Sequence, residues 1–506
     1  MTGTMTGTMT GTMAGTMTGT IAGTMSQGLA LAPLLLLGGV SCIVLLMGAL
    51  AGTRLRVAAT WVAVAAALAA VLASALALSQ AAESRPILAD MWIADRMAFL
   101  FDLIIATTTA MTLATFYPFS REHDFDRGEF PALVLLVASG MVMVVHASHL
   151  LSLLIGIETM SLAAYVLVAC RHRSRKGAEG ALKYFLMGAL ATGFFVYGMA
   201  LVYGTTGGEL SFAGIASRAG AAGNNPLFVL GVYMILAALL FKVGAVPFHM
   251  WLPDAYQGAP TPVTGLMAAG IKAAAVGGLL RLFGSAFLHP GVALGHAGWT
   301  RVVGLVAFAT MTLGNLAAIR QDDVKRMLAY SSIAHAGYLL VGIAALGFGV
   351  PSAQSALIFY IAAYAATTLG TFVVAAWVGR MGDERLRVDD WAGLARRRPA
   401  LALVMTLFLL SLAGVPPTGG FFAKFYLFRA AVDRPELLWL VIAGVLNSVV
   451  SVYYYLRIVV AMYFRDRPGE GFRSYPSLAT GLVLVVLAAV VLMLGVWPAP
   501  VMALVQ

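Results

Sequence analysis

The sequence predicts an all-α polytopic membrane protein, on the evidence of its composition, its run lengths and its few charges. Hydrophobic residues make up 60% of the 506 positions and charged residues only 11%, whereas a soluble domain carries about 25% charge. Such a chain has too few polar groups to cover a globular surface. Its apolar runs are long and do not alternate, which indicates spanning helices and not the strands of a barrel.

The two cysteines, Cys42 and Cys170, are too few for a disulfide framework, a Cys-ligated iron–sulfur cluster or a Cys-based zinc site. The sequence also has no glycine-rich phosphate loop and no nucleophile elbow. A net charge of +10 would suggest nucleic acid as a partner of a soluble protein, but in a membrane protein it follows from basic loops. We therefore expect no cofactor, metal or nucleic acid on this chain.

Residues 1–27 form a Thr/Gly/Met-rich stretch without charge or an apolar face. This composition predicts a disordered extension or a mis-called start. The stretch lacks the basic segment that opens a signal peptide. The rest of the chain divides into helices 1–3 (28–130), helices 4–8 (131–284), helices 9–13 (300–463) and helix 14 (477–506).

About fourteen apolar segments reach the roughly 20 residues that cross a ~30 Å hydrocarbon core. The fourth is short, and the loop after it is nearly absent. The segments lie at 28–50, 57–80, 97–117, 131–147, 149–170, 178–204, 227–251, 262–284, 300–320, 325–348, 353–378, 398–430, 437–463 and 477–500.

The basic residues are divided unequally between the two sides of the membrane. Connections after odd-numbered helices hold 20 of the 32 Lys and Arg residues, and those after even-numbered helices hold seven. Because Lys- and Arg-rich loops stay in the cytoplasm, both termini are predicted to lie on the outer, periplasmic side. The excess of Arg, Ala and Gly suggests a bacterial genome, and hence the bacterial cytoplasmic (inner) membrane.

The chain uses lysine only six times, yet four lysines fall within spans: Lys183, Lys242, Lys272 and Lys424. Arginine keeps its proton in proteins, whereas a buried lysine can exchange it. Glu158, near the middle of the fifth span, is the deepest carboxylate. Inserting these five charges unpaired would cost on the order of 10–15 kcal/mol. We therefore interpret them as proton-exchanging groups and not as packing charges.

Three further inferences concern single residues. Glu158 and Lys183 lie on adjacent predicted helices joined by a short loop, and we expect them to form an ion pair. His335 is central in the tenth span, and histidine titrates near neutral pH. His249 follows a helix break nearer the surface and is a secondary candidate.

Two spans contain a predicted break. Pro247 follows Lys242, and Pro416 and Pro417 precede Lys424; each break frees a backbone carbonyl. Freed backbone groups at membrane depth are tolerated only inside protein or beside water, and paired breaks are typical of inverted repeats around a midplane ion site. We therefore predict two inverted five-helix repeats, helices 4–8 and 9–13.

Two blocks of the sequence resemble a known family. Residues 241–281, which open Phe-Lys-Val-Gly-Ala-Val-Pro-Phe-His-Met-Trp-Leu-Pro-Asp, and residues 322–335, Asp-Asp-Val-Lys-Arg-Met-Leu-Ala-Tyr-Ser-Ser-Ile-Ala-His, are similar to those of the antiporter-like subunits of proton-translocating NADH:quinone oxidoreductase (respiratory complex I). The resemblance covers nearly the whole chain after residue 28. The subunit N type is the most similar, because the M type usually has glutamate in place of Lys424 and the L type continues into a long lateral helix.

This resemblance implies that the chain is a translocase subunit, which couples electron transfer from NADH to quinone to proton pumping. Its partners would be the lipid bilayer and the other membrane-arm and peripheral-arm subunits. FMN, iron–sulfur clusters, NADH and a quinone would belong to the holo-complex and not to this chain. In the implied proton route, Glu158 and Lys183 are the charge pair, and Lys242 and Lys272 are the two central acceptors. His335 links them to the second half, and Lys424 is the terminal donor.

Two alternatives stay open at the level of the sequence. A subunit of a multi-subunit Na+/H+ antiporter shares this fold and most of the lysine pattern, but Lys424 disfavours it. A scaffold that joins the membrane arm without conducting protons would share the fold alone, and the buried charges disfavour it. An autonomous enzyme is not predicted, because nothing in the chain activates a nucleophile or binds a redox cofactor.

Overall fold

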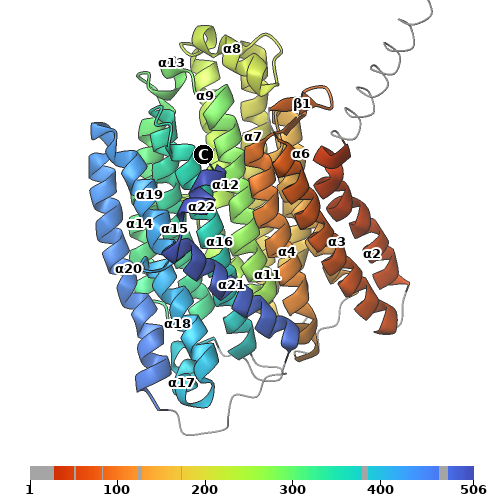
Figure 1. Cartoon of the computed structure of the whole chain (residues 1–506). Helices are drawn as coiled ribbons and strands as arrows, with labels where there is room; N and C mark the ends of the chain where they lie inside the picture. The colour runs from red at the N-terminus through yellow and green to blue at the C-terminus, as the bar shows by residue number, and fades with distance from the viewer. Residues whose placement is uncertain are drawn as a thin grey trace, which may run out of the picture.

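The chain folds into a bundle of long helices packed side by side (Figure 1). The computed structural model describes residues 28–50, 53–81, 84–122, 128–171, 174–378, 384, 386–466 and 477–505. The stretch predicted as a disordered extension or mis-called start, residues 1–27, lies outside them.

Most elements are α-helices, η1 to η3 are π-helical turns, and η4 and η5 are 3-10 turns. In chain order the elements are η1 Leu35–Gly39, α2 Val40–Ala49, α3 Thr53–Gln80, β1 Arg85–Ile87, β2 Trp92–Ala94, α4 Arg96–Glu122, α5 Phe130–Val145, α6 Leu150–Ala169, α7 Arg175–Thr205, α8 Phe212–Ala222, α9 Pro226–Val243, α10 Trp251–Gly258, α11 Thr261–Leu266, η2 Met267–Ile271, α12 Lys272–Arg281, η3 Leu282–Ala286, α13 Pro290–Ala293, α14 Trp299–Ile319, α15 Val324–Gly347, α16 Ala353–Val378, η4 Val388–Trp391, α17 Leu394–Arg397, α18 Pro399–Ala413, α19 Gly419–Val432, η5 Pro435–Leu437, α20 Leu438–Phe464, α21 Leu478–Val496 and α22 Ala499–Val505.

The helix lengths confirm the predicted count of about fourteen spans. Within the described ranges, twelve helices are long and apolar enough to cross a membrane. Two shorter apolar helices, Phe130–Val145 and Pro399–Ala413, occupy the fourth and twelfth predicted segments. The fourth segment is short as expected, and the twelfth is short because a break divides it into α18 and α19.

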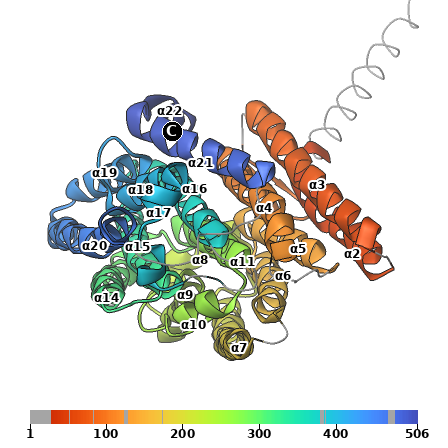
Figure 2. The same ribbon diagram turned by 90° about the horizontal axis from the view of Figure 1, so that it is seen from below.

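The helices differ in how deeply they are buried. The most apolar window of Thr261–Ala286 is 100% buried, and that of Val324–Gly347 is 94% buried, against 28% for Arg175–Thr205. Seen along the bundle, α11 and α16 lie near the centre, whereas α3, α7 and α20 lie at the periphery (Figure 2). Titratable side chains on the central helices are therefore shielded from lipid by protein.

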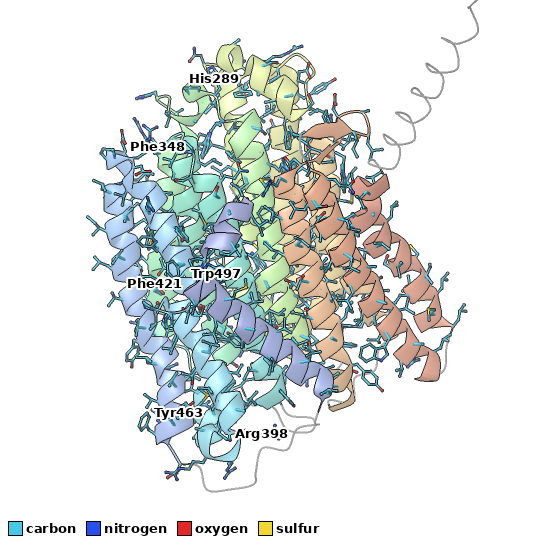
Figure 3. All side chains as sticks on the ribbon, in the orientation of Figure 1. His289, Phe348, Arg398, Phe421, Tyr463 and Trp497 are labelled. Atoms are coloured by element: carbon cyan, nitrogen blue, oxygen red, sulfur yellow. The ribbon has the colours of Figure 1, made fainter. Side chains whose placement is uncertain are left out.

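Short elements close the two ends of the bundle. At the end marked by His289 and Phe348, the helices are joined by α8, by α13 and by an antiparallel hairpin of β1 and β2, which pairs Ile87 with Trp92 (Figure 3). The opposite end, marked by Arg398 and Tyr463, carries α17. The hairpin was not predicted from the sequence, because each strand has only three residues.

Glycines bring neighbouring helices into backbone contact. A Cβ added to Gly337 on α15 would stand 2.5 Å from the amide nitrogen of Met311 on α14, and one added to Gly314 would stand 2.6 Å from the nitrogen of Ala334. Small residues allow this close approach in membrane bundles. Helices α14 and α15 therefore pack as a tight pair.

The two predicted broken helices are confirmed. Both α9 and α18 end at a glycine in the left-handed conformation, Gly244 with φ 76° and Gly414 with φ 87°, which glycine adopts without steric cost. Pro247, Pro416 and Pro417 lie in the non-helical stretches that follow. The chain resumes as α10 in the first half and as α19 in the second.

Candidate functional site

Four of the predicted site residues have buried side chains. The exposed fraction is 5% for Lys242, 2% for Lys272, 4% for His335 and 6% for Lys424. None of the three lysines has a carboxylate within ion-pair distance in the described part of the chain. Their charges are therefore held by hydroxyl groups, carbonyl oxygens and aromatic rings.

Lys242 lies in the last turn of α9 and crosses to α6. Its Nζ donates to Ser161 Oγ at 2.6 Å, and that hydroxyl donates to the carbonyl of Ile157 at 2.5 Å. The rings of Tyr165 and Phe241 lie 5.9 and 5.2 Å from Nζ, distances at which a ring face attracts a cation. The ammonium group is thus enclosed by one hydroxyl and two aromatic rings.

Glu158 and Lys183 do not form the predicted ion pair. Glu158 accepts a hydrogen bond from Thr192 on α7 at 2.6 Å. Lys183 is nine residues before Thr192, about 13 Å along the helix. Ser161, the hydroxyl partner of Lys242, stands three residues after Glu158 on one face of α6. Glu158 and the contact of Lys242 are therefore on the same side of that helix.

Lys183 faces outward because its neighbour faces inward. Tyr184 is fully buried and stacks on Trp251 with the ring centroids 4.0 Å apart. Successive helical residues are about 100° apart, so the Lys183 side chain is 45% exposed and pairs with Glu179 at 2.6 Å and with Asp254 at 2.7 Å. The prediction of a buried pair was therefore wrong in its partner and in its depth.

Lys272 begins α12, directly after the π-helical turn η2. Its Nζ donates to the carbonyl and to Oγ of Ser332 on α15, the latter at 2.5 Å. Tyr364 donates to the same Oγ at 3.0 Å. π-helical turns are frequent at functional sites, and here one of them delivers a cation to the hydroxyl groups between α15 and α16.

His335 lies one turn beyond Ser332 on α15. Its Nδ1 is 2.7 Å from the hydroxyl of Tyr360, and its Nε2 is 3.3 Å from the hydroxyl of Tyr455. The Tyr455 hydroxyl is in turn 2.5 Å from Ser331 Oγ. Both ring nitrogens are thus bonded to hydroxyls, which can each donate or accept a proton.

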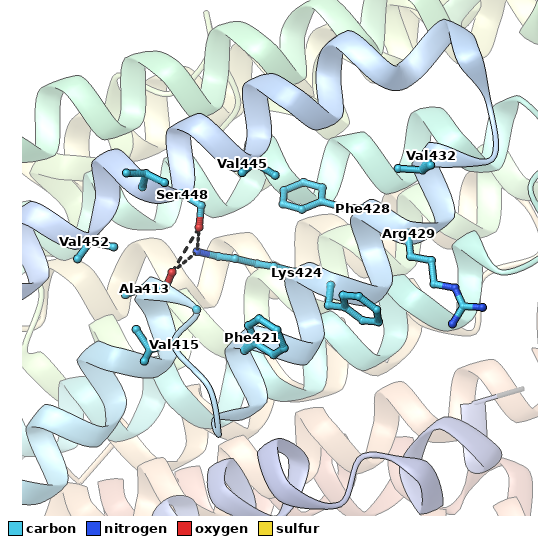
Figure 4. Close-up of a pocket in the computed structure, with 13 residues that line it drawn as sticks. Ala413, Val415, Phe421, Lys424, Phe428, Arg429, Val432, Val445, Ser448 and Val452 are labelled. Carbon is cyan, nitrogen blue, oxygen red and sulfur yellow. Dashed lines mark hydrogen bonds between the residues drawn. The ribbon is translucent and has the colours of Figure 1, made fainter.

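Lys424 lies behind the second break. Its Nζ donates to the carbonyl of Ala413 at 2.8 Å and to Ser448 Oγ at 2.7 Å, as Figure 4 shows. The ring of Tyr338 lies 5.2 Å from Nζ. The side chain also lines a pocket of about 590 Å³, whose other lining residues are almost all apolar and include Phe421 and Phe428.

The polar groups of the second half form a near-continuous series. Lys272 bonds Ser332, Ser332 and His335 share a face of α15, and the rings of His335 and Tyr338 are 5.6 Å apart, with Lys424 beyond. Helices α9 and α12, which carry Lys242 and Lys272, pack directly. No hydrogen bond among the described residues joins those two lysines.

The secondary candidate, His249, lies between α9 and α10 and is half-buried. Its Nδ1 has no hydrogen-bond partner in the described part of the chain. The structure therefore does not connect His249 to the lysines. Likewise, no three His, Cys, Asp or Glu side chains within the described ranges group to hold a metal ion.

Four buried charged or titratable residues were missed from the sequence. Lys325 and Arg281 lie near the ends of the predicted segments 325–348 and 262–284 and were included in the count of basic residues in the connections. Lys325 is nevertheless fully buried, with Nζ 2.6 Å from the carbonyl of Ala259, and Arg281 is 9% exposed. Asp102 and His146 form a fully buried pair. All four lie near helix ends. Burial judged from the position of a residue along its predicted span is underestimated there. The apolar stretch around Arg281 was the available signal.

The comparisons with known proteins agree with this geometry. Residues 147–451 match the family model described as NADH:quinone oxidoreductase/Mrp antiporter, TM. NADH-quinone oxidoreductase subunit N 1 of Sorangium cellulosum is 46% identical over 419 residues, which are 81% of this chain and 82% of that protein. Subunit N of Trichlorobacter lovleyi is 42% identical over 422 residues, 83% of this chain and 84% of that one. The chain belongs to this family.

Solved structures share the fold. A chain of respiratory complex I from Thermus thermophilus is 34% identical with a TM-score of 0.77, covering 93% of this chain and 98% of its own length. A chain of the Mrp complex from a Dietzia species has a TM-score of 0.82 at 22% identity, covering 95% of this chain and 96% of its own; this shows the fold alone. The predicted membership of the antiporter-like family is confirmed.

Proposed function

We propose that the chain is subunit N of an NADH:quinone oxidoreductase and moves protons across the membrane along a buried axis of lysine, glutamate and histidine. The observation that carries the axis is the burial of Lys242, Lys272 and Lys424 without a carboxylate within ion-pair distance among the described residues. Holding such charges at depth is costly. A protein that needed only packing would place apolar side chains there.

In this proposal, charge moves between sites by electrostatic repulsion. Glu158 stands one turn before Ser161, the hydroxyl partner of Lys242, and its negative charge favours the ammonium form of that lysine. When the negative charge of Glu158 no longer stabilises the protonated form of Lys242, Lys242 passes its proton toward Lys272. His335 and its tyrosine neighbours then link Lys272 to Lys424, because hydroxyl groups can relay a proton by exchanging donor and acceptor roles. Lys424 is the terminal donor.

We assign Lys183 a modified role at the entrance to the axis. Its ion pairs with Glu179 and Asp254 are partly exposed. Asp254 also accepts from Arg326 on α15 at 2.6 Å, so it connects α7, α10 and α15. A change in the charge of Lys183 would therefore alter the electrostatic environment of Asp254 on α10, the segment that follows the first break.

The redox groups of the reaction belong to other subunits in this proposal. FMN, iron–sulfur clusters, NADH and the quinone would be bound elsewhere in the complex, and the chain would contribute the translocation step within the membrane arm. Its partners would be the remaining membrane-arm and peripheral-arm subunits. The names of the two relatives reported above, both subunits N, support this assignment over a cation/proton antiporter.

We also propose a bacterial cytoplasmic membrane with both termini outside, supported by the unequal division of Lys and Arg. The end of the bundle that carries the hairpin would then face outward. A reporter enzyme that is active only outside the cytoplasm, fused after residue 506, should be active. A cytoplasmic signal would reverse the orientation.

The assembly is tested by mild-detergent extraction of the tagged full chain, followed by native electrophoresis stained for NADH oxidation. Migration in a large staining band is the expected result. Migration in a smaller, unstained assembly with other antiporter-like chains would replace the proposal with the cation/proton antiporter.

The axis is tested with Lys272→Met in the assembled complex. NADH oxidation in uncoupled vesicles should persist, while the number of protons moved per NADH falls. The matched control is Lys176→Met, because Lys176 is exposed at the start of α7 and outside the axis. An unchanged ratio in Lys272→Met would remove this lysine from the route.

A further inference from the structure

A second group of buried charges lies outside the lysine axis, at the end of the bundle that carries the β1–β2 hairpin. Asp102 on α4 and His146 at the end of α5 are both fully buried, with His146 Nε2 2.8 Å from Asp102 Oδ2. Asp102 lies six residues into α4, about 9 Å from its start. The proposed relay does not use these residues.

The hydrogen bonds of His146 locate its protons. Its Nδ1 is 2.7 Å from the carbonyl oxygen of Ile93, which can only accept, so Nδ1 carries a hydrogen. Between Nε2 and Asp102 Oδ2 one further proton must lie, because two lone pairs would repel at 2.8 Å. The arrangement is therefore a proton-loaded state, whichever of the two atoms holds the proton more closely.

One atom of this pair has no visible partner. Asp102 Oδ1 is buried and accepts no hydrogen bond from the described residues. A buried carboxylate oxygen without a donor is costly, and a protonated carboxyl group reduces that cost.

Above the pair lies a pocket of about 410 Å³. Its lining includes Ile93, whose carbonyl bonds His146, and Ala147, the residue after His146. Asp95 and Arg281 also line it. The ring of Trp92 stacks on His146 with the ring centroids 4.2 Å apart and covers one face of the imidazole. The pocket is thus one residue layer away from the shared proton.

Arg281 connects the pocket to both the pair and the lysine axis. It donates to both oxygens of Asp95 at 2.5 Å and, through Nε, to the carbonyl of Val145 at 2.8 Å. Lys272 and Arg281 are the first and last residues of α12, and a π-helical turn adjoins each end of that helix. The charged groups that face the pair are therefore Asp95 beside the hairpin and Arg281 on α12.

We propose that Asp102 and His146 form a second proton-binding site, which exchanges one proton with the pocket at the outer end of the bundle. On release, the proton leaves the space between Nε2 and Oδ2 for solvent in the pocket, which leaves a neutral His146 with its Nδ1 hydrogen and an ionised Asp102. Its role in transport rests on the proposed function.

The test compares Asp102→Asn, His146→Gln and Lys272→Met complexes reconstituted in vesicles. Protons moved per NADH are measured from about pH 5 to pH 8. The expected result is that both pair variants fall to the ratio of Lys272→Met, with NADH oxidation in uncoupled vesicles unchanged. Ser148→Ala is the matched control, because Ser148 bonds the carbonyl of Asp90 beside the same pocket and not the pair.

The outcomes separate the two proposals. A normal ratio in both pair variants, with a lowered ratio in Lys272→Met, would overturn the second site alone. A normal ratio in Lys272→Met would instead count against the lysine axis. Asparagine and glutamine keep hydrogen-bonding capacity without ionising, so failure of both variants to assemble would identify the pair as a structural clamp and would also overturn the second site. Partial recovery in Asp102→Glu would support it.

Discussion

The broken helices of the two halves have the same backbone turn and different lysine positions. At the first, the N–H that follows Gly244 donates to the carbonyl of Leu240 at 2.9 Å; at the second, the N–H that follows Gly414 donates to the carbonyl of Leu410 at 3.0 Å. Both are the Schellman arrangement that ends a helix at a left-handed glycine. The backbone conformation at the break is therefore the same in the two halves.

The lysines do not follow this repeat. Lys242 stands two residues before Gly244, whereas Lys424 stands ten residues after Gly414. The position ten residues after Gly244 is occupied by Asp254, which pairs with surface cations. Each half thus places its cation on a different segment of its broken helix.

The carbonyls freed by the breaks are also used differently. In the second half, Lys424 donates to the carbonyl of Ala413 at its own break. In the first half, the indole of Trp251 caps the carbonyl of Phe241 at 3.3 Å, and Lys242 turns away to α6. A broken helix therefore supplies a ligand for a cation without obliging the nearest lysine to use it.

The largest expected effect is on transport, and it tests whether the two lysines are equivalent despite this difference. Lys242→Met and Lys424→Met should each lower NADH-driven proton movement by roughly a hundredfold, as expected when a proton-transfer group is removed. NADH-driven acidification in vesicles measures this. If one variant pumps normally while the other is inactive, the two halves have unequal roles.

The next effect is on stability. Among the described residues, Lys424→Met leaves the carbonyl of Ala413 with only the 3.3 Å hydrogen bond from Ser448, and this loss should cost about 1–3 kcal/mol. Lys242→Met should cost less, because Ser161 keeps its bond to Ile157. Thermal dissociation of the purified complex measures the difference. An equal loss of stability in the two variants would show that the hydrogen bond from Lys424 to Ala413 does not stabilise the second break.

A smaller effect distinguishes the hydroxyl partners. Ser161 provides the one hydrogen bond of Lys242 among the described residues, whereas Lys424 keeps Ala413 when Ser448 is removed. Ser161→Ala should slow proton movement by about tenfold, equivalent to a bond of about 1.5 kcal/mol to a charged group. Ser448→Ala should slow it less. The reverse order would show that Ser448 is the essential partner.

The smallest effect is an acid sensitivity at the hairpin end of the bundle, where Asp95 pairs with Arg281 on the last helix of the first half. Burial alone would raise the pKa of Asp95, but the hydrogen bonds and charge of Arg281 hold that pKa below its usual value of 3.8. The resulting stability is present above the unfolded pKa and is lost as pH falls through the lower folded pKa. Asp95→Asn should therefore flatten the acid limb of the thermal-stability profile. An unchanged limb would contradict the assignment.

Much of the fold was predictable because membrane insertion imposes simple rules on composition. Segment lengths, the breaks at Gly244 and Gly414, and the burial of Lys242, Lys272 and Lys424 all follow from apolar runs and proline positions. Pairing was less predictable, because it depends on how each helix is rotated.

Lys183 illustrates this limit. The sequence placed it in a span, but Tyr184 takes the inward direction and Lys183 the outward one. Rotation by a single residue, about 100°, separates an ion pair with Glu158 from one with Asp254. The same applies to Asp102 and His146, which are 44 residues apart in sequence and meet only through the packing of α4 against α5.

The tight contact of α14 with α15 has a practical consequence for spectroscopy. The backbones touch at Gly314 and Gly337, so a displacement of the helix that carries His335 must carry α14 with it. The far side of α14 faces away from the bundle, with Leu305 62% and Leu316 57% exposed. A fluorophore attached at either leucine would therefore report motion of the buried histidine's helix in real time, without altering any residue of the route itself.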